Sequence, residues 1–234
     1  MSCSSAPIER SVSLRVYAGS GVASSVAYEY AASAAAFYAE HQLDLRLSLE
    51  APVALEYALV GSQQDFSQAL LAANLPIDED LTPEQLAQAR FVMGRVMLSA
   101  LLPVLAAPGA DGLTLLVTPE IVSPSLKEFF GLDSDLFGLG FPPATVASEA
   151  AAVAETGLEP FLAAANLERG IALLSESRLR SLAHGRENVV AHELGHALGL
   201  AHRIDAGNLM NPQVELGCRP CLQPSQAEAI AAHW

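Results

Sequence analysis

The sequence lacks the features that several classes of protein require. No uncharged apolar run among its 234 residues reaches the ~20 residues that span a bilayer. Only 12 Lys and Arg accompany 26 Asp and Glu, and the resulting formal charge of −14 offers no basic surface to nucleic acid. Three cysteines are too few for a disulfide framework. The sequence therefore predicts no transmembrane segment and no nucleic-acid partner.

The N-terminus also lacks the basic and apolar regions of a secretory signal. This leaves the compartment open between two alternatives. In one, the protein is secreted or lipid-anchored in a bacterium, with an upstream leader removed and Cys3 acylated. In the other, Cys3 is incidental. The sequence also leaves open the oligomeric state and any calcium requirement.

The length of the sequence and its pattern of apolar and polar residues fit one domain of mixed strands and helices. Alternating apolar and polar residues predict strands at 13–18 and 43–49 around a helix at 22–41, and such a unit favours parallel pairing of its strands. From 123 to 169 the pattern weakens, with Gly, Pro and Ser scattered among short Ala-rich stretches that could be helical. Four further elements are expected: a helix capped by Thr82 and Pro83 that runs to about Leu102, strands at 113–117 and 170–175, and a buried helix from Leu179 to Leu200.

The most informative stretch lies in that last helix. His192 and His196 are four residues apart, so a helix places both imidazoles on one face, at the spacing of a chelating pair. Glu193 follows the first histidine, where its carboxylate can reach a metal-bound water without ligating the ion. The pattern predicts a zinc site with Glu193 as general base.

A catalytic zinc site needs a third protein ligand, and His202 is the expected one. His202 is out of phase with the helical turn, but Gly199 can end the helix in a left-handed conformation and turn the chain back toward the metal. The alternative third ligands are the downstream glutamates Glu215 and Glu228. They would leave Gly199 without a role.

The complete pattern, His-Glu-x-x-His-x-x-Gly-x-x-His from His192 to His202, resembles the metzincin signature. Met210, in Gly-Asn-Leu-Met-Asn-Pro, stands where that family places a methionine turn beneath the metal. Residues 202–212 look most like the matrixin branch, and Pro224 to Ile230 resembles the start of its last helix. A weaker resemblance is to archaemetzincins, which share the late Cys218 and Cys221.

Some positions depart from these patterns. Arg203 stands where matrixins usually carry Ser or Thr, and no ligand cluster for a second structural zinc is evident. Arg203 and Asn208 replace two cysteines of the archaemetzincin structural zinc site, so a four-cysteine site is excluded. We expect Cys218 and Cys221 to form a local disulfide or to stay free.

The resemblance implies a fold of the α/β (α+β) class with a twisted mixed sheet. It divides a single metallopeptidase domain, 1–234, into an upper subdomain, 1–199, and a small lower subdomain, 200–234, below the cleft. It also implies one catalytic Zn²⁺ and a peptide or protein substrate extended along an edge strand, for which Gly170 to Ser175 is the candidate. The predicted function is zinc-dependent endopeptidase. The alternative is a zinc-containing module that binds peptides without cleaving them.

Overall fold

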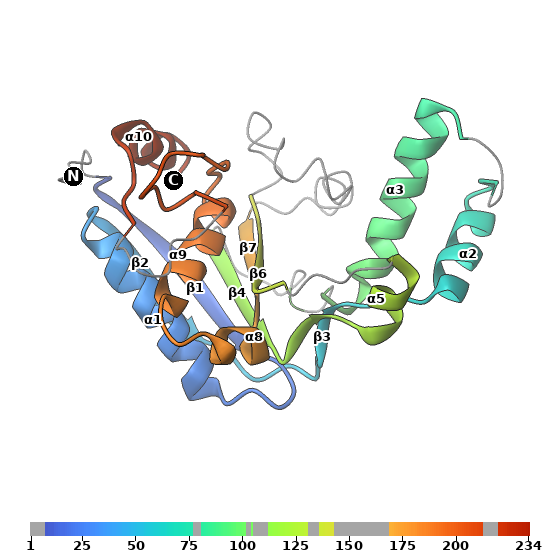
Figure 1. Ribbon diagram of the computed structural model, residues 1–234, viewed down its shortest axis with the longest axis horizontal. Helices are drawn as coiled ribbons and strands as arrows, with labels where there is room; N and C mark the ends of the chain where they lie inside the picture. Colours follow the sequence, from blue (N-terminus) through green and yellow to red (C-terminus); the bar gives the residue numbers. More distant parts are fainter. Residues whose placement is uncertain are drawn as a thin grey trace.

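The computed structural model describes residues 8–76, 81–101, 104, 112–130, 136–142, 169–212 and 220–234. A five-stranded sheet has the order β2-β1-β4-β7-β6, and a smaller sheet pairs β3 with β5 (Figure 1). The strands are β1 (Arg10–Ala18), β2 (Leu43–Leu49), β3 (Tyr57–Leu59), β4 (Gly112–Thr118), β5 (Glu120–Val122), β6 (Gly138–Phe141) and β7 (Arg169–Ser175). The helices are α1 (Ser24–Ala39), α2 (Gln63–Ala72), α3 (Pro83–Met97), η1 (Ser99–Leu101), α5 (Pro124–Phe130), α8 (Glu176–Ser181), α9 (Arg186–Ala197) and α10 (Pro224–His233).

The larger sheet is mixed, as expected. β1 pairs in parallel with β2 across helix α1, which confirms the strand–helix–strand unit predicted from the alternating segments. β4 and β7 continue the parallel order, whereas β6 runs antiparallel to β7. The expectation that Gly170 to Ser175 forms an edge is wrong, because β7 lies between β4 and β6. Among the described strands, β6 forms that end of the sheet.

The two faces of the sheet are covered by different helices. On one face, Leu14, Leu115 and Leu174 pack into a core shared with α1 and α9. On the other, Leu116 and Leu173 pack into a second core with β3, β5 and Phe66 of α2. Because successive residues of a strand face opposite sides, these central strands are apolar at nearly every position. The helix that carries the histidines therefore lies on the α1 face (Figure 1).

The helix predicted from Leu179 to Leu200 is two helices, which corrects that prediction. Leu179 belongs to α8, which ends at Ser181, and α9 begins at Arg186. Leu182 is extended and Gly185 has a left-handed φ of 79° at the N-cap of α9, so the backbone cannot continue as one helix. The sequence marks this break with His-Gly-Arg-Glu-Asn at 184–188, a stretch without apolar residues that contains the glycine.

The segment between β2 and β4 carries a pair of helices, α2 and α3, which stand apart from α1, α9 and α10 (Figure 1). Thr82 caps α3 as predicted: its hydroxyl accepts from Gln85 N–H at 3.2 Å, and Gln85 Oε1 accepts from Thr82 N–H at 3.0 Å. Among the described residues, no helix is long and apolar enough to cross a membrane. The division at residue 199 into two subdomains stays a prediction.

Candidate metal centre

Helix α9 presents His192 and His196 from the interior of the protein. Both side chains are buried, and Tyr38 of α1 fixes the helix from behind by donating its hydroxyl to Ala191 O at 2.8 Å. Burial raises the pKa of Tyr38, which keeps it a neutral donor. Gly195 lies on the inner side of α9, where an added Cβ would come within 2.5 Å of Met210 Sδ. Gly195 thus permits the close packing beneath the histidines.

The end of α9 brings the third histidine back to the first two. Gly199 has φ 96°, and Leu200 N–H bonds to Gly195 O while Gly199 N–H bonds to His196 O, each at 2.9 Å. These two bonds form a Schellman motif, in which a left-handed glycine closes the helix. The chain then reverses, and His202 reaches the same point as His196. The role expected of Gly199 matches this backbone.

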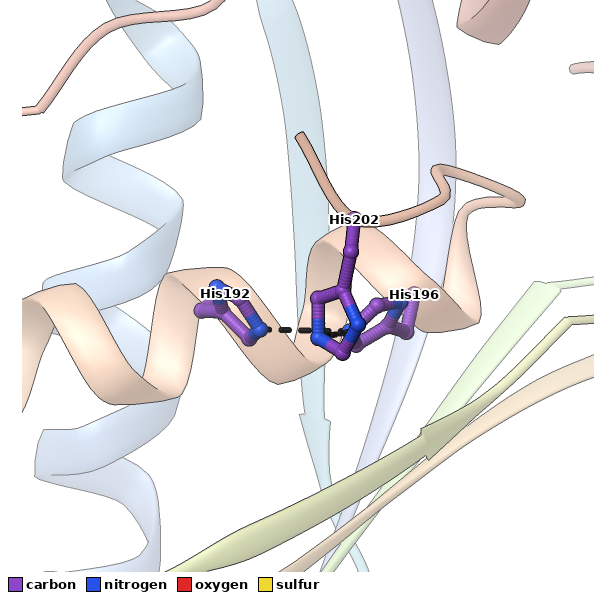
Figure 2. Close-up of side chains that lie close together, drawn as sticks. All are labelled: His192, His196 and His202. Atoms are coloured by element: carbon purple, nitrogen blue, oxygen red, sulfur yellow. Dashed lines mark hydrogen bonds between the residues drawn. The ribbon is translucent and has the colours of Figure 1, made fainter. Parts of the chain in front are cut away.

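The three imidazoles converge on one point (Figure 2). His196 Nε2 lies 3.1 Å from His192 Nε2 and 3.0 Å from His202 Nε2. Nitrogen ligands at ~2.0–2.1 Å from a tetrahedral zinc are separated by roughly 3.3 Å, so the spacing suits one ion. Among the described residues, these three histidines form the only potential metal-binding group of at least three His, Cys, Asp or Glu. Glu228 does not join them, and Glu215 lies outside the described residues.

Backbone carbonyls select the tautomer of two of these rings. His192 Nδ1 lies 2.7 Å from Leu209 O, and His196 Nδ1 lies 2.7 Å from Leu200 O. A carbonyl only accepts, so each Nδ1 carries the proton and each Nε2 of a neutral ring carries a lone pair. The short Nε2 contact between these two rings therefore sets lone pair against lone pair. A cation between them would turn this repulsion into coordination, and the donor set fits Zn²⁺.

Burial keeps these two ligands neutral in acid. Desolvation lowers the pKa of His192 from 6.5 to about 4 and that of His196 to about 3. From unperturbed imidazoles one expects zinc affinity to fall as pH drops through about 6–7. The buried pair instead retains its lone pairs well below that range.

The same pKa values predict an acid-sensitive zinc-free protein. The unfolded chain takes up protons on both imidazoles near pH 6.5, whereas the folded chain does so only near pH 4 and 3. The unfolded state then binds more protons, so stability is present above pH 6.5 and falls as pH drops toward 4, by up to ~1.4 kcal/mol per pH unit for each ring. Urea unfolding in the presence of chelator from pH 7.5 to 4.5 measures this loss.

The titration of Glu193 would partly cancel this loss of stability at low pH, so the experiment uses a variant without the carboxyl group. Burial raises the pKa of Glu193 from 4.5 to about 8, so its carboxyl destabilises the zinc-free fold as pH rises through this interval, the opposite sign. The titration is therefore run on Glu193→Gln, with Glu193→Gln/His196→Ala beside it. A pH slope as steep in the double variant as in the single one would contradict the assignment to His196.

Met210 occupies the turn expected of it, directly behind the histidines. Its side chain is fully buried, and its backbone N–H bonds to Asn208 Oδ1 at 2.9 Å while its carbonyl accepts from Arg203 N–H at 2.8 Å. Asn208 and Gln226 of α10 exchange side-chain amide bonds of 2.8 and 3.2 Å. The turn is thereby fixed to α10. Its Leu209 carbonyl is the one that orients His192.

Glu193 lies beside the triad, packed against strand β6. The side chain is partly buried, and Gly138 of β6 lies directly against its carboxylate. Desolvation raises its pKa to about 8, against a smaller opposite effect of the Gly140 backbone N–H. A carboxyl group with a pKa near neutrality next to a metal site is suited to accept and return a proton.

Comparisons with known proteins give a family match over this site. Residues 157–231, which include all three histidines and Met210, match the family model of the matrixins. This part of the chain is metzincin-like. The mixed α/β sheet and the histidine triad confirm the fold class expected of it.

Solved structures resemble this metzincin-like chain at low identity. Archaemetzincin from Methanopyrus kandleri is 15% identical with a TM-score of 0.48, over 95% of this chain and 94% of that one. Metalloproteinase-II from Bacteroides fragilis is 10% identical with a TM-score of 0.46, over 97% of this chain and 54% of that one, so this chain spans about half its length. No curated protein matches the sequence.

The cysteines contribute no second site among the described residues. Cys221 is disulfide-bonded, and both other cysteines, Cys3 and Cys218, lie outside the described residues. The backbone of Cys221 borders the methionine turn, because Leu209 N–H bonds to Cys221 O and Cys221 N–H to Gly207 O, each at 2.9 Å. Pairing of Cys218 with Cys221 stays a prediction.

We expect one zinc per metzincin-like chain, with no contribution from sulfur. A sulfur already in a disulfide is no thiolate ligand, and two cysteines fall short of the four ligands of a structural site. Cys221→Ser should leave the zinc content, measured by atomic absorption after dialysis, at one equivalent. A wild-type content of two equivalents that falls to one in this variant would contradict this prediction.

Several groups at the site could not be predicted from the sequence. Gly138 and Gly140 of β6 fall in the stretch with no clear pattern, although Gly-Leu-Gly at alternate positions is itself a sign of close backbone approach. The carbonyls of Leu200 and Leu209 carry no sequence signal, because any residue supplies one. The partnership of Asn208 with Gln226 depends on the placement of α10.

Proposed function

We propose that the protein is a zinc-dependent endopeptidase. The observation that carries the proposal is the meeting of three imidazole Nε2 atoms within 4.8 Å of one another, in the segment that matches the matrixins. Two of these atoms bear lone pairs fixed by backbone carbonyls. The matrixin match supports zinc metallopeptidase chemistry, and internal cleavage of a peptide is the specific form we propose.

His192, His196 and His202 would hold the ion, leaving a fourth position for water or substrate. When bound, Zn²⁺ lowers the pKa of a water ligand toward ~7 and polarises the scissile carbonyl. Glu193 takes the proton of the attacking water at its carboxylate and delivers it to the nitrogen of the departing amine. One carboxyl group thus serves as base and then as acid.

Strand β6 supplies the backbone edge for an extended peptide. It is the end strand of the described sheet, and its Gly138 and Gly140 lie against α9 beside the triad. A peptide paired with β6 would be held by main-chain hydrogen bonds, which suits substrates of varied sequence. This replaces β7, the strand suggested by the sequence.

The proposal is tested by incubating the zinc-loaded protein with a diverse peptide library, with and without chelator, and identifying products by mass spectrometry. We expect internal cleavage that chelator abolishes and added zinc restores. Cleavage that persists after the metal is removed would contradict metal-dependent hydrolysis. Binding of peptides with no cleavage at any tested pH would favour the non-catalytic module.

A further inference from the structure

Strand β6 approaches the catalytic helix more closely than any strand with side chains could. A Cβ on Gly138 would come within 2.7 Å of Glu193 Cδ and 2.8 Å of Glu193 Oε1. A Cβ on Gly140 would come within 2.5 Å of His196 Cβ and closer still to the carbonyl oxygen of Glu193. The absence of side chains at both positions is therefore a condition for this arrangement.

The register of β6 places both glycines on the α9 face. Gly138 pairs with Leu174 and Gly140 with Ala172, and both partners belong to the core shared with α9. Leu139, between them, packs into the core on the opposite face. A residue of β6 that carried a side chain at either glycine position would push it directly into α9.

The same register leaves the Gly140 amide free of the sheet. Ser175 N–H bonds to Phe137 O at 3.0 Å, so the residues that exchange bonds with β7 are those at alternate positions from Phe137. In an antiparallel ladder, the residues between them direct N–H and C=O away from the neighbouring strand. Gly140 is one of these, and its N–H acts to lower the pKa of the nearby Glu193 carboxyl group.

We propose that Gly138 and Gly140 are positioning residues for Glu193: their lack of side chains lets β6 lie against the carboxylate and limits where it can lie. The inference rests on the proposed role of Glu193 as general base. Glu193 is long and has several rotamers, so α9 alone does not define where its carboxylate lies. A misplacement of ~1 Å at a reacting group can cost on the order of 10²-fold in rate. The position of the Glu193 carboxylate against β6 should therefore affect kcat.

The two glycines lie against different residues, so their substitutions distinguish an effect on Glu193 from an effect on zinc binding. Gly138→Ala places a methyl group whose three nearest atoms all belong to the Glu193 side chain, so we expect the carboxylate to be displaced while the histidines stay. Gly140→Ala also presses on the Cβ of His196 and should weaken zinc binding. We expect unchanged zinc affinity in Gly138→Ala and reduced affinity in Gly140→Ala, measured by competition with a chromophoric chelator.

The contact itself is read from the Gly140 amide in a ¹H–¹⁵N correlation spectrum. We expect its proton resonance to move upfield in Gly138→Ala and in Glu193→Asp, whose shorter side chain no longer reaches β6. Leu139→Ala, on the opposite face of the same strand, is the matched control for zinc binding and should leave the zinc affinity near its wild-type value. Thermal unfolding of each variant identifies any that fails to fold, and Glu193→Asp leaves β6 itself unaltered.

Activity completes the test. In Gly138→Ala we expect kcat to fall on the order of 10²-fold with KM little changed, since the carboxylate contacts the water more than the peptide. The same substitution in a Glu193→Gln background should add no further loss. An unmoved Gly140 resonance, or full kcat in a zinc-replete Gly138→Ala, overturns the inference. Because the resonance and zinc affinity are read without substrate, they remain decisive even if the protein proves to cleave no peptide.

Discussion

Glu193→Gln is expected to abolish peptide hydrolysis while leaving zinc bound. Glutamine keeps the size and shape of glutamate, and the three ligands are other residues, so the metal site should survive. The amide cannot take the proton of the attacking water. Positioned acid–base groups contribute ~10²–10⁴-fold, and here one carboxylate is used twice, so the loss in kcat should reach or pass the upper end of that range.

The measurement compares kcat and KM at equal zinc occupancy. KM should change little, because Glu193 contacts the water more than the peptide. Glu187→Gln is the matched control: Glu187 lies exposed in the first turn of the same helix, and its replacement should leave kcat unaltered. Full activity in zinc-replete Glu193→Gln would refute the mechanism. Inactivity of both variants and of the wild type under broad screening would favour a peptide-binding module.

The variant has a second expected property that follows from burial. Because desolvation raises the pKa of Glu193 to about 8, the carboxyl group opposes folding of the zinc-free protein at high pH. Its removal should make the zinc-free protein more stable at pH 8 relative to pH 5 than the wild type. A residue that stabilises when removed and is needed for activity is typical of a functional site.

The metal ligands could be predicted from the sequence because their geometry is local. His192 and His196 share one helix at a spacing fixed by its pitch, and Gly199 signals where the helix ends. His202 follows within one reversal of the chain. The structure brings the three together through backbone bonds within a few residues of Gly199, so no long-range information was needed.

The contact of the Glu193 side chain with strand β6 could not be predicted in the same way. Strand β6 has the sequence Gly-Leu-Gly-Phe, whose glycines have a low strand propensity and whose two alternate apolar residues are too few to identify a strand. Its glycines are required by the close contact with α9, which lies about fifty positions later in the chain. The break at Gly185 differs in this respect, because His-Gly-Arg-Glu-Asn at 184–188 does interrupt the apolar spacing, and the glycine there has a left-handed φ of 79°.

The strongest effect on the metal itself is expected from His202→Ala. Two ligands would remain, and the loss of one imidazole should weaken zinc binding by more than the ~10–100-fold that attends the loss of an outer hydrogen-bond partner. His202 lies exposed at the site, unlike the other two ligands. Its truncation should therefore cost the zinc-free fold little, which separates metal binding from folding.

The test is the zinc dependence of thermal unfolding, since a ligand that binds only the native state raises its stability in proportion to the logarithm of concentration over Kd. Wild type and the control His184→Ala, an exposed histidine just before α9, should show the same rise in Tm with zinc. His202→Ala should show a much smaller rise, with an unchanged Tm in chelator, and should lose peptidase activity in step with its zinc content. Unchanged zinc affinity in His202→Ala would remove this residue from the ligands and return the third position to one of the downstream glutamates, Glu215 first.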